Sequence, residues 1–156
     1  MLQNKRQISK ILWTQLIKEL CLRGEGERET GAFLLGKNDS NIITQFICYN
    51  DLDSEAFDSG IIIFKSDGYI PLWKYCNENS LKVLADVHTH PGRWTGQSSP
   101  DKQHPMISQR GHVALIVPCY ATRPQTSIRG VGVYEYLGDK IWKTIRNKSK
   151  TIQIIK

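Results

Sequence analysis

The chain has 156 residues, of which 40% are hydrophobic and 23% charged, and this size and composition are typical of one globular domain. They exclude a disordered chain, a collagen-like fibre and a small disulfide-stabilised scaffold, and no apolar run approaches the roughly 20 residues that cross a bilayer. The net charge of +6 is concentrated in residues 139–156, which hold six basic residues and one acidic residue.

The basic segment 139–156 has two interpretations. It is either a solvated surface that keeps the protein soluble or a contact with nucleic acid or an acidic protein. The four cysteines are widely spaced and form no C-x-x-C pair, and the N-terminal apolar residues lack the continuous run of a signal peptide. We therefore expect reduced thiols and a cytoplasmic location.

Apolar residues recur at three- and four-residue steps from Ile8 to Leu20. This spacing predicts an amphipathic helix over residues 9–22. We expect Gly24 and Gly26 to end it, because glycine readily adopts the backbone conformation that closes a helix.

Two strands are expected next, over residues 31–36 and 42–49. Turn-forming residues at 38–41 separate them, so we expect a β-hairpin. A polar loop follows over residues 52–60, and the β-branched run at 61–65 predicts a further strand.

A second helix is expected over residues 66–79. It would carry Ile70, Trp73 and Cys76 on one face, with Pro71 tolerated only in its first turn.

The C-terminal half is dominated by predicted strands. Residues 81–90 read as a central strand and 113–117 as a second buried one. Residues 128–137 and 140–145 are expected to pair through a hairpin turn at Gly138-Asp139. Mixed strands and helices with several hairpins indicate an α+β fold built on a single mixed β-sheet flanked by helices.

The most informative stretch for function runs from Asp86 to Asp101. His88 and His90 are two positions apart on an expected strand, so both imidazoles point to the same face and can bind one metal ion. Pro91 restricts the backbone of His90 to an extended conformation, which fixes where that ring points.

A short helix is expected to begin near Ser98, with Pro100 in its first turn and Asp101 directly after it. Asp101 would then face the two histidines. Two histidines and one aspartate make three ligands, and a catalytic zinc ion leaves its fourth position to a water whose pKa falls to roughly 7. A hydrolase also needs a carboxylate that does not bind the metal, and this stretch offers none suitable.

Together these residues resemble the JAMM metalloprotease family of metal-binding MPN domains, whose pattern is H-[ST]-H-P, a loop, and then S-x-x-D. Seven residues, 91–97, lie between the second histidine and the serine of the pattern, as in the family. The matching residues are His88-Thr89-His90-Pro91 and Ser98-Ser99-Pro100-Asp101. The family also places a glutamate just before a glycine-flanked apolar strand, and Glu29 precedes the expected strand 31–36 in this way.

The resemblance implies roles for five residues. His88, His90 and Asp101 would bind one catalytic Zn²⁺ ion. Glu29 would hold the zinc-bound water, act as general base and then protonate the leaving amine. Ser98 would hydrogen-bond the oxyanion or the site water. Every position of the motif is filled, so we expect an active enzyme rather than a metal-free scaffold.

The resemblance also implies a fold, a substrate and partners. The JAMM/MPN-like catalytic domain would occupy residues 1–138, with 139–156 forming a basic strand and tail that belong to the same domain or serve as a docking tail. The family cleaves isopeptide bonds after the C-terminal glycine of ubiquitin-like proteins, and this chain is similar to the compact bacterial members. We expect a deubiquitinase-like isopeptidase that acts on a ubiquitin-like protein or its conjugates, with enzymes of the conjugation pathway as partners and no membrane partner.

Two alternatives remain open. One is a non-catalytic MPN-type binding module, and the other is a nucleic-acid-associated JAMM-like protein. The chain outside its basic tail lacks a basic stripe with interleaved aromatics, so we do not expect nucleic-acid binding there. His104 and His112 are further candidate ligands, although no Cys/His cluster indicates a second zinc ion. Asp86 would support the site or face solvent, and Trp94 is a candidate for the substrate groove.

Overall fold

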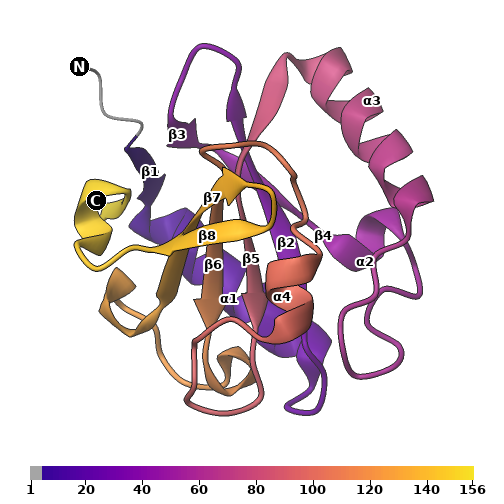
Figure 1. The fold of residues 1–156 in the computed structure, drawn as a ribbon, viewed down its shortest axis with the longest axis vertical. Coiled ribbons are helices and arrows are strands. Elements are labelled where there is room, and N and C mark those ends of the chain that lie inside the picture. The colour runs from indigo at the N-terminus through magenta and orange to yellow at the C-terminus, as the bar shows by residue number, and fades with distance from the viewer. Residues whose placement is uncertain (1–4) are drawn as a thin grey trace.

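A six-stranded mixed sheet forms the centre of the computed structural model, which describes residues 5–156 (Figure 1). In spatial order its strands are β4 (Gln45–Cys48), β2 (Gly31–Lys37), β5 (Leu81–Thr89), β6 (Val113–Val117), β7 (Gly132–Gly138) and β8 (Ile141–Thr144). Only β5 and β6 run parallel, and the other neighbours are antiparallel. The α+β class and the mixed sheet are therefore confirmed.

A second, three-stranded sheet accompanies the large one. It consists of β3 (Ile42–Ile43), β1 (Arg6–Ser9) and β9 (Ile152–Ile155), all parallel, with β1 in the middle. The predicted strand 42–49 is therefore two strands, β3 and β4, which separate at Thr44 and join different sheets.

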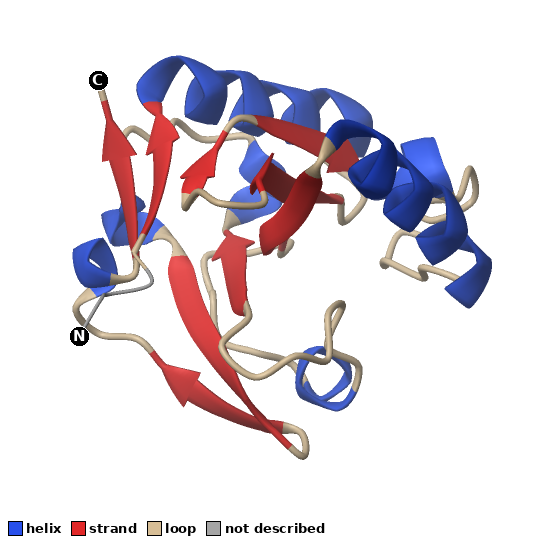
Figure 2. Cartoon of the chain, turned by 90° about the horizontal axis from the view of Figure 1, so that it is seen from above, coloured by secondary structure: helices blue, strands red, loops and turns tan. Residues whose placement is uncertain are grey.

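The longest helix, α1 (Lys10–Gly24), packs on one face of the large sheet (Figures 1 and 2). The Ser9 hydroxyl caps it by accepting a hydrogen bond from the Leu12 amide at 3.1 Å. The prediction of a helix over 9–22 is confirmed, with an end two residues later. Glu25, not a glycine, takes the left-handed closing position with φ 53°.

The other face of the sheet is covered by α2 (Tyr49–Leu52), α3 (Tyr69–Asn79) and the loop between them. Helix α3 follows a 3-10 turn at Ser66–Gly68, which agrees with the predicted helix over 66–79. It buries Leu72 and Cys76, which are one turn apart. Of the three residues predicted to share one face, Ile70 and Trp73 are exposed, with exposed fractions of 68% and 43%, and only Cys76 is buried.

Residues 61–65 were expected to form a strand, and this expectation is wrong. The segment is extended, but the structure assigns it to neither sheet. Its backbone bonds to the loop instead: the Ile63 amide donates to the Ala56 carbonyl at 3.0 Å, and the Lys65 amide donates to the Asp53 carboxylate at 2.9 Å.

The C-terminal hairpin differs from the prediction at both ends. Ile128–Gly130 is a 3-10 turn, so β7 begins only at Gly132, and the turn to β8 uses Asp139 and Lys140. The short helix α4 (Ser99–Gln103) and 3-10 turns at Cys119–Ala121 and Lys148–Lys150 complete the fold.

Two apolar cores fill the molecule, one on each face of the large sheet. Strand β2 contributes to both, so its apolar run is buried from Gly31 to Gly36 without alternation. Within residues 5–156, no helix is long and apolar enough to cross a membrane. Helix α4 lies on the side of the sheet opposite α1, and this is the side that carries the candidate site (Figure 2).

Candidate metal centre

Strand β5 places His88 and His90 on one face of the large sheet. The intervening Thr89 points to the other face, where its hydroxyl accepts a hydrogen bond from the Thr30 amide at 2.9 Å. The cross-strand neighbours of His88 are Gly31 of β2 and Ile116 of β6. His88 therefore stands in the middle of the sheet, which is a rigid position for a ligand.

Helix α4 brings Asp101 to the two histidines. Ser98 caps this helix: its hydroxyl accepts from the Asp101 amide at 3.3 Å, while its own amide donates to Asp101 Oδ2 at 2.8 Å. This reciprocal capping box fixes the Asp101 side chain. The helix ends at Gln103, two residues before Pro105, so it is short, as predicted.

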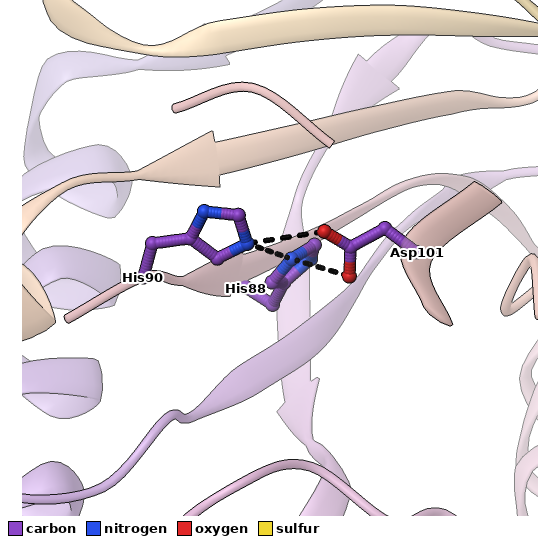
Figure 3. Close-up of side chains that lie close together, drawn as sticks. All are labelled: His88, His90 and Asp101. Atoms are coloured by element: carbon purple, nitrogen blue, oxygen red, sulfur yellow. Dashed lines mark hydrogen bonds and ion pairs between the residues drawn. The ribbon is translucent and has the colours of Figure 1, made fainter. Parts of the chain in front are cut away.

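The three side chains converge on one point (Figure 3). His88 Nε2 lies 3.2 Å from His90 Nε2 and 3.2 Å from Asp101 Oδ1, and His90 Nε2 lies 3.1 Å from Asp101 Oδ2. Among residues 5–156, these three form the one group of three or more His, Cys, Asp or Glu side chains spaced to hold a metal ion.

The geometry of the group fits zinc. Zinc binds histidine nitrogen and carboxylate oxygen at about 2.0–2.2 Å, which puts the corners of a tetrahedral site about 3.3 Å apart. The observed separations of 3.1–3.2 Å are close to that edge length. Two imidazoles and a carboxylate supply three protein ligands, the number found in catalytic zinc sites.

His90 is held by the loop that follows it. Its Nδ1 lies 3.2 Å from the Trp94 carbonyl, which can only accept a hydrogen bond, so Nδ1 carries a proton and Nε2 is the nitrogen that a metal would bind in place of the proton shared with Asp101. The Trp94 ring stacks on the imidazole, with ring centres 5.5 Å apart and planes 24° apart. Trp94 is 62% exposed and lies outside the cleft described below, so it supports a ligand rather than lining that cleft.

Charge and burial act in opposite directions on this group. Burial alone would raise the pKa of the Asp101 carboxyl, but hydrogen bonds from His88 and His90 outweigh it and hold that pKa well below its usual range. For His90 the signs are opposite. Burial lowers its pKa, but the hydrogen bond and negative charge of Asp101 outweigh burial, and the pKa of His90 is raised. Asp101 is therefore a carboxylate at neutral pH.

The loop after His90 is fastened to β7. The Tyr134 hydroxyl donates to the Thr95 carbonyl at 2.6 Å. A Cβ atom at Gly132 would come within 2.4 Å of that carbonyl oxygen, so the close approach of the loop requires glycine at this position.

A left-handed turn at Cys119–Ala121 fastens the start of the same loop. Its three residues have φ values of 57°, 54° and 59°, a conformation that costs about 1–2 kcal/mol for each residue other than glycine. The Tyr120 amide donates to the His90 carbonyl at 2.8 Å, and the Cys119 amide donates to the Gly92 carbonyl at 2.9 Å. This strained turn therefore holds the backbone of His90, one of the three candidate metal ligands.

A cleft of about 670 Å³ opens beside the triad. Glu29 lies two residues before the start of β2. It is in the wall of the cleft together with His88, Ser98 and Asp101. The Glu29 amide donates to the Gly60 carbonyl at 2.8 Å, and its charge helps to raise the pKa of His90. The structure thus gathers all five predicted site residues in one place, and their roles remain predictions.

Two further predicted candidates are placed differently. His112 lies against Asp86 with Nε2 2.6 Å from Oδ2, and both side chains are 3% exposed. Asp86 lines the cleft with a buried side chain. His112 contacts Asp86 and is not part of the group of candidate ligands. His104 lines the cleft but lies outside the group of candidate ligands.

Sequence reasoning did not single out Tyr49 or the pairing of Asp86 with His112. Tyr49 lies in the cleft wall although it is far from the motif in sequence. The signal available was weak: Asp86 is two residues before His88, and this spacing puts both on one strand face.

No protein-family model matches the chain. Solved structures share its fold along nearly its whole length. Protein DSY2949 of Desulfitobacterium hafniense has a TM-score of 0.64 at 16% identity, covering 95% of this chain and 91% of that one. A protein of Salinibacter ruber has a TM-score of 0.59 at 16% identity, covering 95% and 90%.

A third structure is described as JAMM, a metalloprotease-like zinc site in the proteasome and signalosome. Its TM-score is 0.51 at 15% identity, and the match covers 97% of this chain and 98% of that one. At such identities the likeness concerns the fold alone. The protein therefore has the JAMM/MPN fold, as its motifs predicted, with a group of residues that can hold a metal ion where β5 meets α4.

Proposed function

We propose that this protein is a zinc-dependent isopeptidase that hydrolyses the amide bond after the C-terminal glycine of a ubiquitin-like protein. The observation that carries the proposal is the convergence of His88, His90 and Asp101 at 3.1–3.2 Å, beside a cleft whose wall contains Glu29. Amide hydrolysis by a metal enzyme needs a metal site and a separate proton acceptor, and this cleft offers side chains for both.

His88, His90 and Asp101 would hold the ion and leave its fourth position open. When bound, zinc supplies Lewis acidity, which polarises a carbonyl and brings the pKa of water to roughly 7. Ser98 keeps Asp101 in the orientation that this binding needs, because their two backbone-to-side-chain hydrogen bonds are reciprocal.

Glu29 accepts the proton of the attacking water and passes it to the leaving amine nitrogen, so one group serves both steps. The Ser98 hydroxyl oxygen accepts from the Asp101 amide and leaves its own proton free to donate to the carbonyl oxygen as negative charge develops. A donor of this kind lowers the barrier by about 3 kcal/mol.

The burial of the ligands supports a substrate tail that ends in glycine. The side chains of His88, His90 and Asp101 are only 12%, 6% and 18% exposed, so a scissile carbonyl flanked by bulky side chains would be kept away from them. Glycines remove that obstacle. We place this activity in the cytoplasm, where it removes a modifier from conjugates or processes its precursor alongside enzymes of the conjugation pathway.

The test combines metal removal with one substitution. Protein stripped with a chelator and then reloaded with zinc is incubated with conjugates and tail-extended precursors of ubiquitin-like proteins. We expect cleavage only in the loaded protein, and we expect Glu29→Gln to lower kcat/KM by about 100- to 10,000-fold. Elemental analysis should still find one zinc per Glu29→Gln chain.

His88→Ala is the matched control, because it should lose both zinc and activity. Full activity in Glu29→Gln would overturn the assignment of the base. Zinc-loaded protein that binds a modifier without cleaving it would instead support the non-catalytic binding module.

A further inference from the structure

We propose that the Tyr49 hydroxyl is a further substrate-contacting donor of the metal cleft, which hydrogen-bonds a carbonyl oxygen of the bound amide. The proposal rests on the function proposed above and adds a residue that neither the motif nor the triad contains. It is carried by the position of the Tyr49 ring and by the state of its hydroxyl.

The Tyr49 ring occupies space next to His88. Gly31 is the cross-strand neighbour of His88, and a Cβ atom at Gly31 would come within 2.4 Å of Tyr49 Cε2. The ring therefore takes the place that a side chain of residue 31 would fill on the same sheet face. This position puts Tyr49 in the wall of the cleft with Glu29 and Asp101.

The hydroxyl has no partner of its own. Within the part of the chain that the structure describes, Tyr49 Oη is the one buried side-chain polar atom without a hydrogen bond. Leaving such a group unpaired costs about 1–3 kcal/mol, so an isolated case calls for a function. The aromatic ring is packed on Phe33 and Phe64, with ring centres 4.8 and 5.5 Å away, and phenylalanine would serve that packing equally well.

The Tyr49 hydroxyl keeps its proton at physiological pH and can therefore donate it. Burial raises the pKa of Tyr49 well above its ordinary value, and the negative charges of Asp86 and Asp101 raise it further. Asp86 already accepts from His112 at 2.6 Å. An amide carbonyl that enters the cleft beside His88 would give the Tyr49 hydroxyl an uncharged acceptor.

The first test is kinetic. Tyr49→Phe removes only the hydroxyl, and we expect kcat/KM for the isopeptide substrate to fall about 2- to 10-fold. Zinc content should be unchanged, and the melting temperature should stay the same or rise because an unpaired buried hydroxyl has been removed. Tyr75→Phe, which alters an exposed tyrosine outside the cleft, is the matched control and should keep full activity.

The second test does not depend on turnover. Zinc-loaded Glu29→Gln protein labelled with ¹⁵N in its backbone and with ¹³C at tyrosine Cζ is titrated with a tetrapeptide that ends in Gly-Gly joined to the lysine side chain. We expect the Tyr49 resonance, identified by its loss in Tyr49→Phe, to shift while the Tyr75 resonance stays in place.

These readouts separate two kinds of failure. Wild-type protein without hydrolytic activity contradicts the proposed function, and the resonance of Tyr49 still reports whether it contacts the peptide. An active wild type with an equally active Tyr49→Phe variant overturns the proposal for Tyr49. A peptide that shifts backbone resonances along the cleft but leaves Tyr49 unchanged overturns it as well.

Discussion

His90 is fixed at four points by four different segments of the chain. Its amide donates to Val117, its carbonyl accepts from Tyr120, its Nδ1 faces Trp94 and its Nε2 faces Asp101. A ligand held through both backbone and ring loses little further conformational freedom when it binds a metal. At the residue scale, therefore, the candidate metal site is preorganised by contacts within the protein.

The buried pair of Asp86 and His112 makes a prediction at the same scale. His112→Ala should lower the free energy of unfolding by about 3–5 kcal/mol, because it leaves a carboxylate buried without its partner. Urea denaturation measures the change. The double variant Asp86→Ala and His112→Ala should lose less than His112→Ala alone, and a larger loss in the double variant would contradict this explanation.

The ligand types could be predicted from the sequence, but the residues that support them could not. His88, His90 and Asp101 lie within one short stretch whose spacing is meaningful by itself. Tyr120 and Tyr49 reach the site only because β6 and β4 deliver them there. Nothing in the local sequence around either tyrosine distinguishes it from an ordinary core or loop residue.

The turn between β7 and β8 shows strain at the scale of an element. Asp139 and Lys140 have φ values of 52° and 61°, which match a type I′ turn, and this turn favours Asn followed by Gly. A lysine with positive φ is strained, whereas glycine adopts that conformation freely.

Lys140→Gly should therefore stabilise the protein by about 1 kcal/mol, which corresponds to a rise of about 2–4 °C in the melting temperature. Calorimetry measures the shift. Lys140→Ala is the control, because alanine keeps the strain while it also removes the charge. An equal gain in both variants would assign the effect to charge and not to the backbone.

Element prediction succeeded where burial on both faces produces an uninterrupted apolar run, as in β2 and β6. It failed where tertiary partners decide the outcome. Residues 61–65 have the composition of a strand, yet the loop around Asp53 and Ala56 takes their hydrogen bonds. The short strands β1 and β9 were not predicted, because four residues give too little periodicity to recognise.

At the scale of the whole molecule, the basic C-terminal segment is also part of the framework. Strand β8 pairs with β7, β9 pairs with β1, and Ile145 and Ile152 are buried in the main core. Its charged side chains Lys143, Arg146 and Lys150 are exposed. Charge and framework can therefore be altered separately.

Deleting residues 139–156 should lower the free energy of unfolding by at least about 3 kcal/mol, since burial of two isoleucines alone contributes that much. Urea denaturation measures the loss. Replacing Lys143, Arg146 and Lys150 by glutamine is the control that should leave stability nearly unchanged. A deletion variant as stable as the full chain would show that the segment adds no stability. If the glutamine variant keeps its stability but loses substrate affinity, the basic side chains of residues 139–156 contribute to substrate docking.

The pairing of β1 with β9 has a consequence for biosynthesis. These strands are neighbours in the small sheet, yet Arg6 and Ile152 lie almost at opposite ends of the chain. A ribosome makes the two strands in succession, so β1 emerges long before β9 exists and exposes an unpaired edge in the meantime. The small sheet can close only after residues 152–155 have left the exit tunnel, so it is completed after the strands of the large sheet have been made.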